Sequence, residues 1–111
     1  QKLGNLDQAR KLYEQVVASS TSEVAARAQY MIGSIEFEQQ KHADAIKSYF
    51  KVIYGYSFPA WQAEAMYEAA RCFEILGKQS QAIKQYEELV EKFPDSDKTP
   101  LAKERLKVLK N

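Results

Sequence analysis

The sequence predicts an all-α fold in which antiparallel helical hairpins follow one another along the chain. Two observations support this prediction. The chain resembles itself at a nearly constant interval, and inside each copy the apolar residues recur three and four positions apart, as they do on one face of a helix. The 111 residues have room for one compact unit of about three hairpins, so we expect a single array over 1–111.

An alanine, an aromatic residue and an aliphatic residue recur with the same spacing in three places. The first and second copies of this triplet lie 36 residues apart, and the second and third lie 37 apart, at each of its positions. Because three copies agree at all three positions, the interval marks a structural repeat. The triplets are Ala9, Tyr13 and Val17, then Ala45, Tyr49 and Ile53, then Ala82, Tyr86 and Val90.

Each copy contains two helical segments joined by a short turn. The triplet belongs to the second segment, in which Ala82, Tyr86 and Leu89 fall on one helix face. A segment of the same character precedes it, as Met66 and Phe73 illustrate. The helices are expected near 6–19, 22–39, 42–56, 59–76, 79–92 and 98–110.

Turn and cap residues separate these helices. Gly77 adopts positive φ easily where a helix ends, and Gln40 occupies the matching place without being a glycine. Ser57 and Thr99 lie just before prolines, where a hydroxyl residue suits the N-cap of the following helix. We therefore expect hydroxyl caps at the starts of the fourth and sixth helices.

Small residues recur where the paired helices must approach closely. A larger side chain at any of these positions would overpack a hairpin. We therefore expect Ala82→Leu to destabilise the fold and Lys84→Leu to be tolerated. The small residues are Ala9, Gly33, Ala45, Ala70 and Ala82.

The order of a small residue, an aliphatic–glycine pair, an aromatic, a turn and Ala-x-x-x-aromatic resembles the tetratricopeptide repeat. The resemblance covers nearly the whole chain and implies a right-handed superhelix of antiparallel helix-turn-helix hairpins, an α-solenoid. The chain departs from the family pattern at Gln29, Met66 and Ala70, and its interval exceeds the usual ~34 residues. The resemblance rests on Ile32, Gly33, Phe37, Ala45 and Tyr49 in one copy and on Ala69, Ala70, Phe73, Gly77, Ala82, Tyr86 and Pro94 in the next.

The resemblance also implies how the array divides. Residues 1–20 are expected to form the second helix of one repeat, 21–57 and 58–95 two full repeats, and 96–111 a terminal or capping helix. Because two hairpins are only half present, we expect the chain to be a fragment of a longer protein. Each hairpin of such an array buries its apolar face only against its neighbours, so exposed terminal helices favour self-association.

The long interval and the segment Tyr-Glu-Glu-Leu-Val-Glu-Lys-Phe-Pro-Asp-Ser at 86–96 resemble a bacterial envelope subset of the family. That subset includes the Tol-Pal-associated periplasmic coordinator and outer-membrane assembly lipoproteins. The resemblance favours the periplasm or cell envelope slightly over the cytoplasm. The residues themselves specify no compartment, since the single Cys72 cannot form an intramolecular disulfide.

Composition argues against catalysis, metals, cofactors, nucleic acid and membrane insertion. With one histidine and one cysteine, neither a catalytic constellation nor a metal site is expected, and His42 is expected to pack or to face solvent. Lys plus Arg number 16 against 15 Asp plus Glu, and this net charge of +1 leaves no basic stripe for nucleic acid. No apolar run approaches the ~20 residues that span a bilayer.

The family resemblance implies a binding groove, lined by the first helix of each hairpin, that takes an extended peptide or a partner helix. Tyr30 and Tyr67 occupy equivalent places there, and Arg71 lies one turn beyond Tyr67. Tyr and Arg often dominate interface energies, although the two tyrosines can instead complete the core between repeats. The expected groove residues are Arg27, Tyr30, Ser34, Phe37, Glu38, Glu64, Tyr67, Glu68, Arg71 and Glu74, with Glu104 and Arg105 extending the set onto the last helix.

Together these features predict a non-catalytic scaffold that binds another protein or peptide. Two alternatives stay open: the array self-associates, or it regulates or targets a larger enzyme of which it is one module. A helical-repeat reader of RNA is a further alternative, which the near-neutral charge disfavours.

Overall fold

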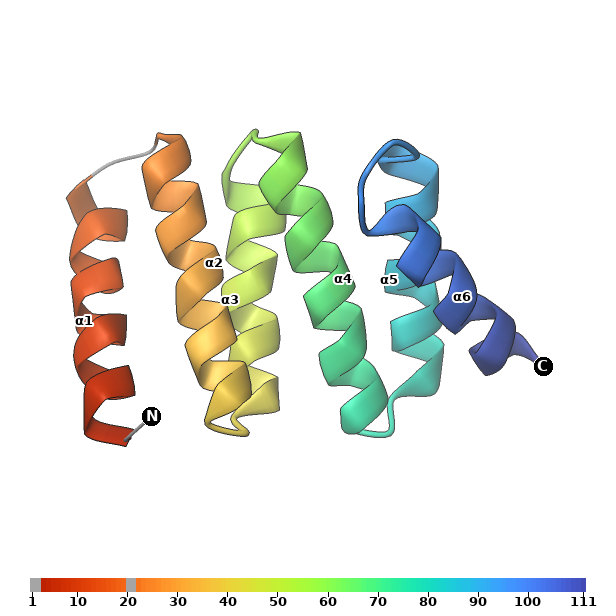
Figure 1. Ribbon diagram of the computed structural model, residues 1–111, viewed down its shortest axis with the longest axis horizontal. Coiled ribbons are helices and arrows are strands. Elements are labelled where there is room, and N and C mark those ends of the chain that lie inside the picture. The colour runs from red at the N-terminus through yellow and green to blue at the C-terminus, as the bar shows by residue number, and fades with distance from the viewer. Residues whose placement is uncertain (1–2, 20–21) are drawn as a thin grey trace.

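The computed structural model describes residues 3–19 and 22–111, and these form a row of six α-helices without a strand. The helices run antiparallel, each beside the next along the chain, over a body of 42 × 28 × 19 Å (Figure 1). The predicted all-α helical-repeat solenoid is confirmed. The helices are α1 (Leu3–Ser19), α2 (Glu23–Glu38), α3 (His42–Gly55), α4 (Pro59–Ile75), α5 (Gln79–Lys92) and α6 (Thr99–Lys110).

The helices form two layers. Figure 1 shows α3 behind α2 and α4, and α6 in front of α5. The helices α2 and α4 also lie against each other, in addition to contacting their neighbours in sequence. We refer to the front layer as the α2/α4/α6 face.

The predicted helix boundaries hold to within one residue, except that α1 extends back to Leu3. The predicted hydroxyl caps are wrong. Phe58 and Lys98 occupy the N-cap positions of α4 and α6, and neither makes a side-chain cap hydrogen bond. The reason at α6 is that Thr99 already lies inside the helix, so its Oγ1 reaches back and donates to the carbonyl oxygen of Phe93 at 2.5 Å.

The turns within the two complete hairpins share one geometry. Gln40 has φ 64° and Gly77 has φ 76°, so both adopt the left-handed conformation that ends a helix. The following residue closes each turn in the same way: the N–H of Lys41 donates to the carbonyl oxygen of Glu36, and that of Lys78 to Phe73, each at 2.8 Å. The predicted equivalence of the two turns is confirmed, with Gln40 carrying the backbone strain that a glycine avoids.

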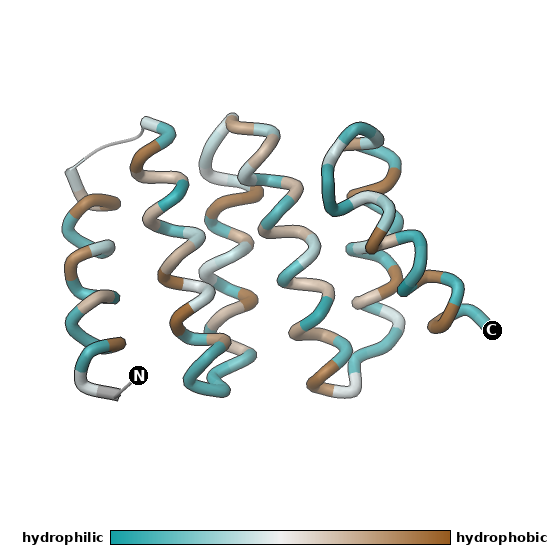
Figure 2. Tube along the Cα trace, in the orientation of Figure 1, coloured by the Kyte–Doolittle hydropathy of each residue, from teal (hydrophilic) through white to brown (hydrophobic). Residues whose placement is uncertain are grey.

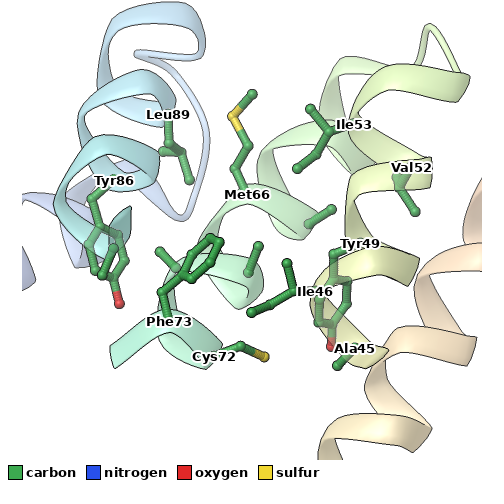
Figure 3. Packing of buried hydrophobic residues seen from close by; sticks show 14 of the residues in the cluster. Ala45, Ile46, Tyr49, Val52, Ile53, Met66, Cys72, Phe73, Tyr86 and Leu89 are labelled. Atoms are coloured by element: carbon green, nitrogen blue, oxygen red, sulfur yellow. The ribbon is translucent and has the colours of Figure 1, made fainter. Parts of the chain in front are cut away.

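The main hydrophobic core lies where α3, α4 and α5 meet. Hydrophobic and hydrophilic segments alternate along each helix (Figure 2), which brings apolar side chains to the contacts between helices. Figure 3 shows Met66 of α4 between Ile53 of α3 and Leu89 of α5. The aromatic members of the second and third triplets, Tyr49 and Tyr86, are 1% and 0% exposed.

The small residues allow close approach between helices. A Cβ atom added at Gly33 would lie 2.7 Å from Cε1 of Tyr49, closer than side-chain packing permits. Ala45, Ala70 and Ala82 are fully buried, while Ala9 is half-buried. The close approach of paired helices that the small residues predict is therefore confirmed most directly at Gly33. There the ring of Tyr49 occupies the space that a methyl group would need.

Candidate functional site

An open pocket lies between the C-terminal halves of α2 and α4, and we call it the α2–α4 pocket. It has a volume of about 710 Å³. Five of the ten predicted groove residues meet there, because α2 and α4 present the same helix face in successive repeats. Its lining consists of Ser34, Phe37 and Glu38 from α2, Glu68, Arg71 and Ile75 from α4, and Gln40, His42 and Tyr49 from the turn and α3.

Arg71 bridges the two walls of the α2–α4 pocket. Its guanidinium carbon lies 4.9 Å from the centre of the Phe37 ring, and its Nη1 donates to Oε1 of Glu68 at 2.8 Å. The Arg71 side chain is 45% exposed, and the one hydrogen bond described for it uses a single N–H group of Nη1. The ion pair and the aromatic ring thus hold a guanidinium in place with donors left over for a ligand.

Tyr30 and Tyr67 are half-buried and pack against the core between repeats. The Tyr30 ring lies 5.4 Å from that of Tyr49 and 5.3 Å from that of Trp61, and the Tyr67 ring lies 5.9 Å from that of Tyr86. Burial, followed by the carboxylates of α4, raises the pKa of Tyr30 well above its ordinary value. The geometry therefore agrees with the alternative in which the tyrosines complete the core.

Glu74 serves as a brace between helices. Its Oε2 accepts a hydrogen bond from the Tyr86 hydroxyl at 2.6 Å, and its carboxylate accepts two from Arg105, at 3.1 and 2.5 Å. Burial alone would raise the pKa of Glu74, but the bonds from Arg105 and Tyr86 outweigh it and leave the pKa lowered. Both Glu74 and Arg105, which sequence reasoning assigned to the groove, therefore have partners within the fold that join α4, α5 and α6.

A second pocket lies between the start of α4 and the turn that joins α5 to α6, and we call it the α4–turn pocket. Its volume is about 430 Å³, and Glu64 is the predicted groove residue that lines it. Lys98 lies beside this pocket, with Nζ 3.8 Å from Oε1 of Glu64 and 5.2 Å from the centre of the Tyr67 ring. Arg27, by contrast, is exposed on α2 and lines neither pocket.

Sequence reasoning missed three residues of this face. The Trp61 ring packs against that of Tyr30 at an interplanar angle of 49°, and its Nε1 donates to Oε2 of Glu23 at 3.2 Å. Ile75 is 54% exposed at the edge of the α2–α4 pocket. Lys98 precedes α6, outside the helical periodicity from which the set was chosen. Ile75 lies one helical turn after Arg71, and this spacing was the signal that could have identified it.

Three observations concern metal binding and the side chains of Cys72 and His42. Within residues 3–19 and 22–111, no group of three or more His, Cys, Asp or Glu side chains is placed to hold a metal ion. Burial, and then the charge of Glu68, raises the pKa of Cys72 to about 12, so its thiol stays protonated at neutral pH. His42 packs edge-on against Phe37 at 5.0 Å between ring centres, as expected for a packing residue.

Among the described helices, none is both long enough and apolar enough to cross a bilayer.

Comparison with known proteins identifies the repeat. A family model described as tetratricopeptide repeat matches residues 1–61, more than half of the 111 residues, and a second model with the same description matches residues 64–96. The comparison with curated proteins and the comparison with solved structures each found no match. The two family matches cover the hairpins whose geometry is described above, and the chain belongs to the tetratricopeptide repeat family.

Proposed function

We propose that this chain is a scaffold that binds a peptide or helix of another protein on the α2/α4/α6 face, with the α2–α4 pocket as an anchor point. Repeats of this family generally mediate protein–protein interaction and are typically non-catalytic. The observation that supports the pocket as the anchor is the convergence of Ser34, Phe37, Glu38, Glu68 and Arg71 on one open depression.

The chemistry of the pocket suits a partner with both apolar and polar groups. Phe37 and Ile75 offer apolar surface, while Arg71 and Glu38 offer a donor and an acceptor at the rim. A ligand side chain that covers Ile75 would remove a large exposed apolar group from water, which stabilises a complex. Aromatic and arginine side chains in such pockets often contribute most of the binding energy.

The test compares two substitutions that each replace an exposed large apolar side chain with arginine. Ile75→Arg fills the rim of the α2–α4 pocket, while Tyr54→Arg alters α3 at a residue that is 66% exposed and lines neither pocket. After both variants are shown to melt like the native chain, each is used to capture partners from cell extract. We expect the native chain and Tyr54→Arg to capture the same protein and Ile75→Arg to lose it. Equal capture by all three would place the partner elsewhere.

Self-association is a second candidate, and exposed apolar residues on the outermost helices favour it. Leu12 of α1 is 62% exposed, and Leu101 and Val108 of α6 are 45% and 60% exposed. Head-to-tail stacking of these helices would bury all three residues. Light scattering at increasing protein concentration tests this candidate: a rising mass that Val108→Lys abolishes supports it, and a constant monomer mass contradicts it.

We also propose the repeat boundaries 21–57 and 58–95, with 1–20 as a second helix and 96–111 as a terminal or capping helix. The matching turns at Gln40 and Gly77 support this division, since each lies inside one proposed repeat. The resemblance of residues 86–96 to the envelope subset supports a place in the periplasm or cell envelope. Fractionation of cells that express the tagged protein tests this placement, and recovery in the cytoplasmic fraction would contradict it.

A further inference from the structure

The two pockets open on the same face of α4. Ala60 and Glu64 line the α4–turn pocket, while Arg71 and Ile75 line the α2–α4 pocket. On a helix with 3.6 residues per turn, these four residues lie within about 60° of one another around the axis. A single ligand that crosses α4 on the α2/α4/α6 face therefore meets both pockets.

The distance between the pockets sets the spacing of the ligand's anchors. The centre of the α4 residues that line the α4–turn pocket lies between Pro59 and Glu64. The centre of the α4 residues that line the α2–α4 pocket lies between Glu68 and Ile75. These centres are about ten residues apart, which is about 15 Å along the helix. An extended peptide advances about 3.3 Å per residue, and its side chains alternate between two opposite faces. Side chains four or six positions apart therefore point the same way, and their span of about 13–20 Å reaches both pockets.

Both pockets carry negative charge although the whole chain does not. Their linings contribute five carboxylates against the cations of Arg71 and Lys92, a formal charge of −3, whereas the net charge of the chain is +1. Adding Lys98, which pairs with Glu64, still leaves −2. The complementary ligand is therefore basic. The five carboxylates belong to Glu38, Glu64, Glu68, Asp95 and Asp97.

Apolar side chains form the surface between these charges. Pro59, Ala63 and Phe93 line the α4–turn pocket, and Phe37 and Ile75 line the α2–α4 pocket. Volumes of about 430 and 710 Å³ leave room for a bulky side chain in each. A small or purely polar side chain would leave these walls exposed to water, so each pocket favours a large apolar anchor.

We infer that the partner of this face is an extended basic peptide segment that carries two bulky apolar side chains four or six positions apart. The inference rests on the proposed function, since it specifies the ligand of the same face. One anchor occupies each pocket, and flanking lysine or arginine side chains face the exposed carboxylates of Glu38, Asp95 and Asp97.

The test selects peptides from a random 12-residue library on the native chain, with Ile75→Arg as counter-selection. The consensus peptide is then titrated against three proteins by fluorescence anisotropy. These are the native chain, the pocket variant Asp95→Asn/Asp97→Asn, and a matched control, Glu14→Gln/Glu91→Gln, which also removes two exposed carboxylates but from α1 and α5. All three must first show the same thermal melting.

We expect a consensus rich in Lys and Arg with two large apolar residues four or six positions apart. Its affinity should fall about two- to fivefold for Asp95→Asn/Asp97→Asn and should be unchanged for the control, since exposed charge pairs contribute modestly. Acidic or single-anchor peptides that still require Ile75 would overturn this inference and leave the proposed function standing. Failure to select any peptide that distinguishes the native chain from Ile75→Arg would overturn both.

Discussion

Replacing Gly33 with alanine would place a methyl group 2.7 Å from Cε1 and 2.9 Å from Cδ1 of Tyr49. The ring has little freedom to move aside, because Tyr49 is 1% exposed, its hydroxyl lies 3.1 Å from Oγ of Ser34, and the Tyr30 ring lies 5.4 Å away. The substitution therefore tests whether the close approach of α2 and α3 depends on the absence of a side chain.

Two opposing effects set the size of the change. Forcing an extra methyl group into a packed core costs about 1–3 kcal/mol. Alanine gains about 1 kcal/mol over glycine inside a helix. The free energy of unfolding of Gly33→Ala should therefore fall by up to about 2 kcal/mol, which corresponds to about 4 °C of melting temperature per kcal/mol in a domain of this size.

Urea unfolding followed by far-UV circular dichroism measures this change. Gly55→Ala is the matched control, because Gly55 ends α3 and an added Cβ there meets nothing within 4 Å. A double-mutant cycle with Tyr49→Leu isolates the contact, and the cost of Gly33→Ala should shrink in that background. The reasoning is refuted if Gly33→Ala is at least as stable as the native chain, or if its cost is unchanged when Tyr49 is leucine.

Three further sets of substitutions test the turns, the contacts of Glu74 and the hairpin packing. Gln40→Gly should stabilise the fold by about 0.5–1 kcal/mol by relieving positive φ, and Gly77→Ala should destabilise it by about 1 kcal/mol, both read from urea midpoints. Glu74 has a lowered pKa, so it stabilises the fold above its ordinary pKa of 4.5 and loses this effect as the pH falls through the lowered value. Glu74→Gln should therefore lose less stability than the native chain on acidification, and parallel pH profiles would contradict this. Ala82→Leu should destabilise by about 1–3 kcal/mol while Lys84→Leu leaves the melting temperature unchanged, and equal melting would contradict the packing.

The sequence by itself determined the repeating part of the fold. Helix positions follow from the spacing of apolar residues along the chain, and this signal is local, so five of the six helices were placed to within one residue. The equivalence of Gln40 and Gly77 and the burial of Tyr49 and Tyr86 were predictable for the same reason. Each of these predictions concerns a position that recurs in successive copies together with its neighbours in the sequence.

Only the tertiary structure decided which side chains remain available on the α2/α4/α6 face. Glu74 lies on the same helix as Arg71, but a residue 31 positions further along the chain, Arg105, binds its carboxylate. Tyr30 packs on Trp61 because α2 and α4 lie against each other, and the α4–turn pocket exists because the loop after α5 lies over the start of α4. Helical periodicity gives the direction of a side chain around its own axis, whereas its partner depends on how neighbouring helices and loops are packed.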